Sequence, residues 1–138
     1  MRTAVVVVSH SHALAEGVKE LALQMARANT SVWAVGGTED GIGTSALAIR
    51  DALASAMQAA DEAVVLMDLG SAHLNTVMAI EMLDEELRPR VWMADAPIVE
   101  GAILAVVSAA SGDSGEEVRE RAQEAREMRK LISGGVTT

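Results

Sequence analysis

The chain alternates short runs of consecutive hydrophobic residues with longer segments in which hydrophobic residues recur every three or four positions. Uninterrupted apolar runs rich in β-branched side chains are typical of strands buried on both faces, whereas the longer spacing is typical of amphipathic helices. The expected strands cover residues 4–8, 32–35, 63–67 and 91–94. A segment of helical period follows each strand.

Two of the helical segments predict which side chains will face the sheet. Residues 11–28 form the first expected helix, and the third helix follows the strand at residues 63–67. Residues three or four positions apart share one face of a helix. The expected buried stripes are Leu14, Val18, Leu21, Ala22 and Met25 in the first helix, and Leu74, Val77, Ile80 and Leu83 in the third.

The last helical segment is polar and begins with a clear N-terminal signal. Ser114 and Glu117 have the spacing of a capping box, and Glu117 is also expected to form an ion pair with Arg121 one turn later. The hydrophobic stripe of this helix is thin and ends at Ile132. Residues 133–138 are expected to form a flexible tail.

Four strand–helix units in succession predict a parallel sheet, because each right-handed crossover returns the chain to the same edge. We therefore expect an α/β fold, in the form of a small doubly wound, flavodoxin-like domain. Its mainly parallel sheet should have about four strands, with helices on both faces. A chain of 138 residues suits one such core, and the domain is expected to span residues 1–132.

Composition excludes several classes of function. A formal net charge of −9 would repel a phosphate backbone, and two Trp without Phe or Tyr provide no aromatic platform for single-stranded nucleic acid. The absence of cysteine excludes a thiol nucleophile and a thiolate zinc site. No apolar run approaches the roughly 20 residues of a membrane span, and the short run before His10 does not resemble a signal peptide. We expect a cytoplasmic protein without nucleic-acid or membrane partners.

Three of the four expected strands are followed by a titratable side chain, namely His10, Asp68 and Asp95, at the carboxyl edge where open parallel sheets bind ligands. His10 precedes a helix N-terminus, whose amides and dipole favour an anion, and its imidazole can act as a nucleophile toward a phosphoryl group. If the first and third strands are neighbours, Asp68 would hold one ring nitrogen of His10 and leave the other free. The alternative is a loop histidine and a turn aspartate with structural roles only.

The other polar residues at this edge carry weaker signals. Ser71 suits either a helix cap or a phosphate ligand, whereas His12 and His73 have no clear partner and are interpreted as structural. A metal site built from the first two histidines and Asp68 lacks the usual ligand spacing, so no metal is expected. The glycine-rich loop at residues 36–45 matches no nucleotide-binding motif and is interpreted as a mobile rim.

Four short motifs, in a fixed order, carry a resemblance to a known family. They are Ser9-His10-Ser11 with Leu14-Ala15-Glu16-Gly17-Val18, Gly37-Thr38 with Ile42-Gly43-Thr44, Met67-Asp68-Leu69-Gly70-Ser71-Ala72, and Ala96-Pro97-Ile98-Val99-Glu100-Gly101. The chain thereby resembles the phosphotransfer subunits of phosphoenolpyruvate-dependent dihydroxyacetone kinase. Their wider relatives are the mannose-type enzyme IIA domains of the bacterial phosphotransferase system (PTS). The resemblance extends from about Thr3 to about Ala125.

The resemblance implies a role for each motif. His10 would be phosphorylated on Nε2 by the phosphocarrier protein HPr and would pass the phosphoryl group to ADP in the nucleotide-binding subunit of the kinase. Asp68 would be the acidic partner of this histidine. The residues implied to contact the phosphoryl group or line its pocket are Ser9, Ser11, Gly37, Thr38, Gly43, Thr44, Gly70 and Ser71. The chain would bind no cofactor of its own, because Mg-ADP belongs to the partner subunit, and it would form a homodimer.

Three alternatives stay open at this point. A mannose-type enzyme IIA that serves a sugar transporter would use the same histidine chemistry. A response-regulator receiver would be phosphorylated on Asp68, but receivers need an acidic pair where Ser9 and His10 stand, and a lysine after a fifth strand. A flavin-binding module would need an aromatic side chain to stack on the flavin, and Trp33 and Trp92 both fall inside expected strands.

Overall fold

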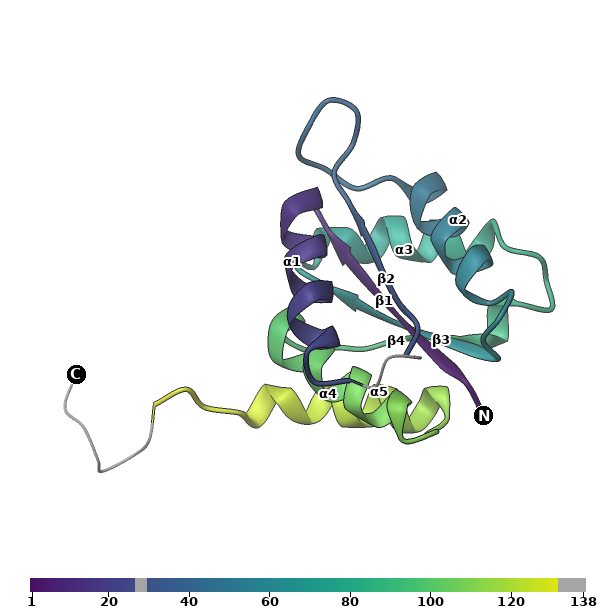
Figure 1. Ribbon diagram of the computed structural model, residues 1–138. Coiled ribbons are helices and arrows are strands. Elements are labelled where there is room, and N and C mark those ends of the chain that lie inside the picture. The colour runs from purple at the N-terminus through teal and green to yellow at the C-terminus, as the bar shows by residue number, and fades with distance from the viewer. Residues whose placement is uncertain (27–29, 132–138) are drawn as a thin grey trace.

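A parallel sheet of four strands forms the centre of the molecule in the computed structural model, which describes residues 1–26 and 30–131 (Figure 1). The strands lie in the order β2-β1-β3-β4, and each neighbouring pair is parallel. Their bounds are β1 (Thr3–Ser9), β2 (Val32–Gly36), β3 (Glu62–Met67) and β4 (Val91–Met93). The four expected strands are therefore confirmed.

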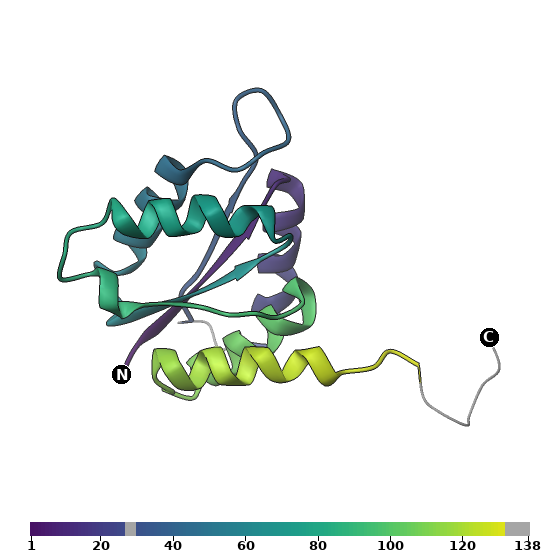
Figure 2. The ribbon, with the colours of Figure 1, turned by 180° about the vertical axis from the view of Figure 1, so that it is seen from behind.

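Helices cover both faces of the sheet, as Figures 1 and 2 show from opposite sides. One face carries α1 (His12–Leu23), α4 (Ile98–Ala110) and α5 (Gly115–Gln123). The other carries α2 (Ala46–Ala56) and α3 (Ser71–Glu81). Two short 3-10 turns are η1 (Arg88–Arg90) and η2 (Glu124–Glu127). This arrangement is the doubly wound, flavodoxin-like α/β fold expected from the sequence.

The side chains of β1 supply both hydrophobic cores. Val6 and Val8 belong to the core shared with α2 and α3, whereas Val5 and Val7 belong to the core shared with α1, α4 and α5. This division follows from the alternation of side chains along a strand. Every residue of β1 is buried, as a continuous apolar run predicts for a strand covered on both faces.

The functional edge is defined by the direction in which the chain leaves two neighbouring strands. After β1 the chain enters α1 on one face of the sheet, and after β3 it enters α3 on the opposite face (Figure 1). Because β1 and β3 are adjacent, the two connections diverge at the carboxyl edge. Such a switch point is where doubly wound folds bind ligands, and His10 and Asp68 both lie there.

The predicted buried stripe of α1 is partly wrong. Its buried residues are Ala15, Val18 and Ala22. The exposed members of the expected stripe are Leu14, Leu21 and Met25. The small alanines let the helix approach the sheet closely, so they decide the buried face and the larger side chains lie on its flanks. The helix also ends at Leu23 rather than at residue 28; residues 27–29 lie outside the described residues.

A similar correction applies to α3, whose buried residues are Ala72, Thr76 and Ala79. Leu83, just beyond the helix, is buried as expected, but Leu74 is 70% exposed. Helical period alone ranks leucine above alanine as a core residue. In the folded chain the line of small residues faces the sheet, and Leu74 points to solvent near the start of the helix.

The start of α5 confirms the capping box and changes the expected ion pair. The Ser114 hydroxyl accepts the Glu117 N–H at 3.2 Å, and the Glu117 carboxylate accepts the Ser114 N–H at 3.1 Å. Because Glu117 turns back to the cap, Arg121 pairs with Glu124 at 3.1 Å instead. Ile132 and the tail at residues 133–138 lie outside the described residues.

Candidate active site

The carboxyl ends of β1 and β3 bring His10 and Asp68 into direct contact. The register pairs Val8 with Met67, and the Asp68 N–H donates to the Val8 carbonyl at 3.1 Å. The residues that follow therefore stand side by side, with His10 Nδ1 3.0 Å from Asp68 Oδ1. Both side chains are largely covered, at 21% exposure for His10 and 9% for Asp68.

The Asp68 carboxylate accepts hydrogen bonds from four donors. Besides the His10 ring, the His10 N–H (2.9 Å) and the Ser9 hydroxyl (3.0 Å) donate to Oδ2, and the Leu69 N–H donates to Oδ1 at 2.8 Å. Burial raises the pKa of Asp68, but the hydrogen bonds from His10, Ser9 and Leu69 together outweigh it and hold the pKa below its usual value. Asp68 is therefore an ionised carboxylate whose acceptor positions are filled.

These contacts decide which nitrogen of His10 is available. An ionised carboxylate can only accept, so the Nδ1 atom that faces Asp68 carries the proton. In the neutral ring Nε2 then keeps its lone pair, and the Ser71 hydroxyl, 2.9 Å away, is placed to donate to it. An imidazole with one nitrogen held by a carboxylate and the other unprotonated is an oriented nucleophile.

Two helices begin beside His10, and only one of them has a side-chain cap. Ser11 caps α1 by accepting the Leu14 N–H at 3.1 Å, and the Ser11 N–H donates to the Ser9 hydroxyl at 3.0 Å. Ser71 is the first residue of α3 and does not cap it, because its hydroxyl contacts His10. The Ala72 and His73 N–H groups donate to the Leu69 and Gly70 carbonyls at 3.0 Å each, so α3 offers an anion held at Nε2 the positive end of its dipole rather than these two amides.

Part of the glycine-rich β2–α2 loop forms a wall of the site. The Gly43 N–H donates to the His10 carbonyl at 2.8 Å, and a φ of 149° suits glycine at this position. Thr44 is held by Asn75 of α3, whose side-chain amide donates to the Thr44 hydroxyl at 2.6 Å. Of the four loop residues expected at the pocket, Gly43 thus contacts the His10 segment and Thr44 contacts α3.

The other two, Gly37 and Thr38, lie farther out along the loop. Thr38 and Gly41 exchange backbone hydrogen bonds of 2.8 and 3.0 Å and close a short hairpin, which projects from the body of the molecule (Figure 1). With His12, both residues line a shallow hollow beside α1. Among the described residues, neither forms a hydrogen bond with His10.

A cleft of about 590 Å³ lies between the ends of β3 and β4. Asp68, Gly70 and His73 line one side of it, and Asp95 lines the other. Asp95 also forms an ion pair with Arg126 at 3.5 Å. Gly70 therefore faces this cleft, while the His73 side chain makes no hydrogen bond within the described part of the chain.

Two residues that position the site are not identified by the sequence analysis. Gly36 ends β2 where a Cβ atom would stand 2.6 Å from the Ser11 carbonyl oxygen, so only glycine lets the two segments pass. Asn75 lies four residues after Ser71, and this helical spacing is the signal that points to it. Gly36 carries no such signal, because the sequence does not say which glycine of a pair meets another backbone.

The described residues give no sign of a metal site or a membrane-spanning helix. In residues 1–26 and 30–131, no three His, Cys, Asp or Glu side chains are grouped to hold a metal ion. No helix within these ranges combines the length and the hydrophobicity needed to cross a bilayer.

Trp92, one of the two aromatic residues, has a packing role away from His10. Its indole N–H donates to Glu62 at 2.6 Å, near the start of β3. The Arg119 guanidinium lies 4.8 Å from the centre of the ring, a cation–π distance. The ring is thus engaged by neighbours, which weakens the flavin-binding alternative.

Comparison with known proteins places the chain in a family. The family model described as PTS system fructose IIA component matches residues 4–119, a range that holds both His10 and Asp68. The phosphoryl donor subunit DhaM of PEP-dependent dihydroxyacetone kinase from Escherichia coli (strain K12) is 44% identical over 110 residues, covering 77% of this chain and 23% of that one. The DhaM subunit of kinase 2 from Listeria innocua is 39% identical over 106 residues, covering 76% and 84%.

Solved structures agree with the fold. A protein described as of unknown function superposes with a TM-score of 0.78 at 33% identity, covering 89% of this chain and 94% of that one. The mannose/sorbose-specific IIA subunit from Enterococcus faecalis superposes with a TM-score of 0.56 at 19% identity, covering 96% and 98%, which supports the fold alone.

The chain belongs to the PTS system fructose IIA component family and, within it, to the group that contains the DhaM subunits. The resemblance inferred from the four sequence motifs is confirmed. The chain spans less than a quarter of the Escherichia coli relative but most of the Listeria innocua one.

Proposed function

We propose that this chain is a phosphohistidine carrier. It accepts a phosphoryl group from phospho-HPr on Nε2 of His10 and transfers it to ADP bound in the nucleotide subunit of dihydroxyacetone kinase. The observation that carries the proposal is the orientation of His10, whose Nδ1 atom donates to ionised Asp68 while Nε2 faces the Ser71 hydroxyl. The relatives' names, which describe phosphoryl donor subunits of that kinase, support the choice of acceptor.

The first transfer uses the lone pair on Nε2 of His10. That pair attacks the phosphorus of phospho-HPr, a bond forms between Nε2 and phosphorus, and the bond to the donor breaks with its electron pair leaving on the donor. The proton on Nδ1 stays between the ring and Asp68, so the carboxylate balances the positive charge that the ring gains. The Ser71 hydroxyl and the positive end of the α3 dipole stand ready to stabilise the phosphoryl oxygens.

The second transfer returns His10 to its starting state. An oxygen of the terminal phosphate of ADP attacks the phosphorus, the bond to Nε2 breaks, and its electron pair returns to the ring while ATP forms. The nucleotide and its magnesium ion belong to the partner subunit, and this chain supplies the oriented histidine. Each step needs positioning and charge balance rather than a protein base, because no proton has to be removed from His10. We further propose that the carrier works as a homodimer.

The contacts of Asp68 argue against the receiver alternative, in which this carboxylate would itself be phosphorylated. Its oxygens accept four hydrogen bonds and its side chain is only 9% exposed. An attack by Asp68 on phosphorus would require these bonds to break. His10 Nε2 has one hydroxyl neighbour that can rotate away.

The proposal is tested by measuring intact mass after incubation with phosphoenolpyruvate, enzyme I and HPr, followed by peptide mapping in alkali. The wild type should gain one phosphoryl group on the peptide that bears His10, and the ADP-loaded kinase subunit should remove it. His10→Ala should gain none while keeping its fold, and His73→Ala should behave like the wild type. No gain of mass in the wild type, or an unchanged gain in His10→Ala, contradicts the carrier role. A phosphohistidine that the kinase subunit fails to discharge favours a sugar-transport enzyme IIA instead.

A further inference from the structure

Three large hydrophobic side chains lie exposed around His10. We call them the apolar rim: Ile42, Leu69 and Leu74, which are 76%, 60% and 70% exposed. Ile42 precedes Gly43, which binds the His10 carbonyl, and the Leu69 N–H binds the Asp68 carboxylate. Leu74 lies one turn after the start of α3, where the Ser71 hydroxyl meets His10 Nε2.

The position of the rim decides how it should be interpreted. Scattered exposed leucines are ordinary on protein surfaces, whereas apolar side chains gathered at one place mark an interaction site. All three members of the rim come from segments tied by hydrogen bonds to His10 or Asp68. A surface that contacts them therefore also lies against the segments that hold His10 and Asp68.

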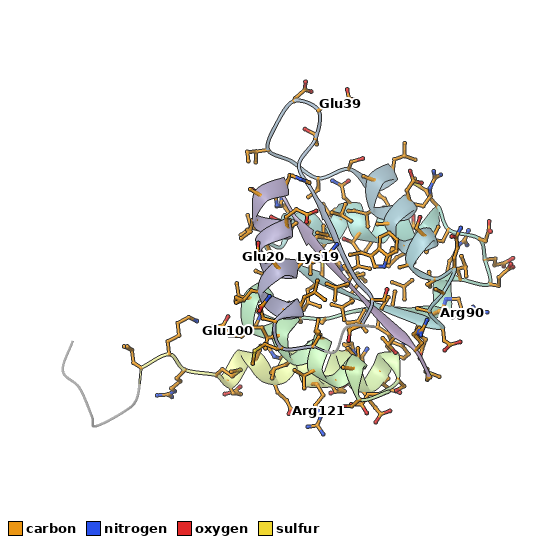
Figure 3. The ribbon with its side chains drawn as sticks, viewed as in Figure 1. Lys19, Glu20, Glu39, Arg90, Glu100 and Arg121 are labelled. Carbon is orange, nitrogen blue, oxygen red and sulfur yellow. The ribbon has the colours of Figure 1, made fainter. Side chains whose placement is uncertain are left out.

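Among the described residues, no basic side chain is bonded to the groups of the site. In the described part of the chain, no lysine or arginine forms a hydrogen bond or ion pair with His10, Asp68 or Ser71. The projecting hairpin at residues 38–41 carries Glu39 and Asp40, and neither is in an ion pair among the described residues. Figure 3 shows Glu39 at the outer end of this loop, away from the labelled Lys19, Arg90 and Arg121.

A phosphoryl group adds up to about two negative charges to a site that already holds carboxylates. In addition to the positive end of α3, basic side chains of the protein that docks there can supply positive charge during transfer. The diphosphate of a bound ADP is typically held through magnesium and basic side chains. The rim of such a pocket complements the carboxylates of the hairpin.

We propose that the apolar rim and the hairpin at residues 38–41 form the docking surface for the nucleotide-bearing kinase subunit, with Glu39 and Asp40 pairing with basic side chains beside its Mg-ADP. This inference rests on the proposed function and adds which surface docks and which charges recognise the partner. The hairpin is closed by two backbone bonds between Thr38 and Gly41, and the Gly43 N–H ties the loop to His10. A partner bound at the hairpin is thus held at a defined position relative to the His10 segment, as transfer between two proteins requires.

The test reverses charge at the hairpin and compares it with an identical reversal elsewhere. Glu39→Lys/Asp40→Lys is matched by Glu85→Lys/Glu86→Lys, another adjacent, exposed acidic pair, in the loop after α3. Each carrier is phosphorylated with enzyme I and HPr, checked by intact mass, and titrated into the kinase subunits with dihydroxyacetone. The hairpin variant should raise the apparent KM for the carrier about tenfold and leave kcat within about twofold, whereas the control should change neither. The KM of the wild type should rise with salt more steeply than that of the hairpin variant.

A second set of variants tests the apolar rim in the same assay. Ile42→Ser and Leu74→Ser should each raise the KM for the carrier several-fold, and Leu21→Ser, at an exposed position on α1, should not. Circular dichroism of every variant verifies that the fold is retained.

Several outcomes overturn the docking proposal. One is an equal rise in KM for both charge reversals, which would mean that binding depends only on the net charge of the carrier. Another is an unchanged KM for the hairpin variant. A fall in kcat at constant KM would place the hairpin in the chemistry rather than in docking. Loss of charging by HPr with normal kinase turnover would assign the surface to the donor. If the wild type is never phosphorylated, or never drives the kinase, the carrier function itself is overturned. This outcome is distinguishable from failure of the docking proposal, because it is seen in the wild type without any variant.

Discussion

At the scale of single residues, Asp68 connects the fold to the chemistry. It holds the His10 main chain at the end of β1 and also holds the His10 ring, through separate oxygens. Ser9 and Leu69 complete its four donors. The same contacts that keep the Asp68 carboxylate ionised therefore fix the tautomer of His10. A change in the charge of Asp68 would alter the tautomer of His10.

Replacing Asp68 with asparagine should lower stability in a pH-dependent way. At neutral pH, Asp68→Asn should reduce the free energy of unfolding by about 1–3 kcal/mol, because a charged acceptor of buried donors is lost. The pKa of Asp68 is lowered in the folded chain from an ordinary 3.8, so its contribution is present above that value and is lost as pH falls through the folded pKa. The gap between wild type and variant should thus narrow in urea titrations below about pH 4.

The control for this measurement is Asp84→Asn, at an exposed position whose carboxylate accepts no hydrogen bond among the described contacts. Its effect should be small at every pH. A constant gap for Asp68→Asn across the acid range would show that the charge of Asp68 does not stabilise the fold. In the transfer assay, Asp68→Asn should be phosphorylated more slowly than the wild type, because the His10 tautomer is no longer fixed.

At the scale of elements, the site is assembled where a loop is tied to a helix. The β2–α2 loop has two anchors, the Gly43 N–H on the His10 carbonyl and the Thr44 hydroxyl on Asn75. Asn75 and Ser71 lie one turn apart on α3, so one helix both contacts the nucleophile and positions the loop beside it. The projecting hairpin depends on these anchors for its place.

Removing the Asn75 anchor should loosen the loop without unfolding α3. Asn75→Ala removes the amide that donates to Thr44, so the Gly43 amide should exchange its hydrogen roughly tenfold faster, while amides in the middle of α3 keep their protection. Hydrogen exchange followed by mass spectrometry measures both segments. Gln58→Ala, at an exposed position after α2, is the comparison variant. Unchanged exchange at Gly43 would mean that the bond to His10 holds the loop alone.

At the scale of the whole molecule, two cores share one sheet. The core on the α2 and α3 side includes Leu53, and the core on the α1, α4 and α5 side includes Leu66. Both are fully buried, and β1 and β3 contribute side chains to each core. If either layer of helices detached, it would expose side chains of the strands against which the other layer packs. The domain should therefore unfold as a unit.

Cavity-forming substitutions in the two cores test this cooperativity. Leu53→Ala and Leu66→Ala should each reduce the free energy of unfolding by about 2–5 kcal/mol. Trp33 in β2 and Trp92 in β4 report from opposite edges of the sheet, and single-tryptophan backgrounds separate their fluorescence. Both tryptophans should report the same urea midpoint in each variant. Two separate midpoints would mean that the layers unfold independently.

Much of this fold follows from local pattern, and each exception has a physical cause. The runs at residues 4–8 and 63–67 identify strands because uninterrupted β-branched sequence has few alternatives. The expected faces of α1 and α3 fail at Leu14 and Leu74, since hydrophobicity alone does not show that small residues allow the closest packing. The Glu117–Arg121 pair fails because the cap competes for the same carboxylate.

By itself, the sequence determined the strands, the alternation of strand and helix, the doubly wound class, and the two candidate residues that directly follow the first and third strands. Those are properties of period and order along the chain. Tertiary structure alone decided that β1 and β3 are neighbours, that the Ser71 hydroxyl reaches Nε2, and that Gly36 and Asn75 shape the wall of the site. The physical reason is that such contacts depend on distances between segments far apart in sequence, which packing of the two cores sets and local pattern does not record.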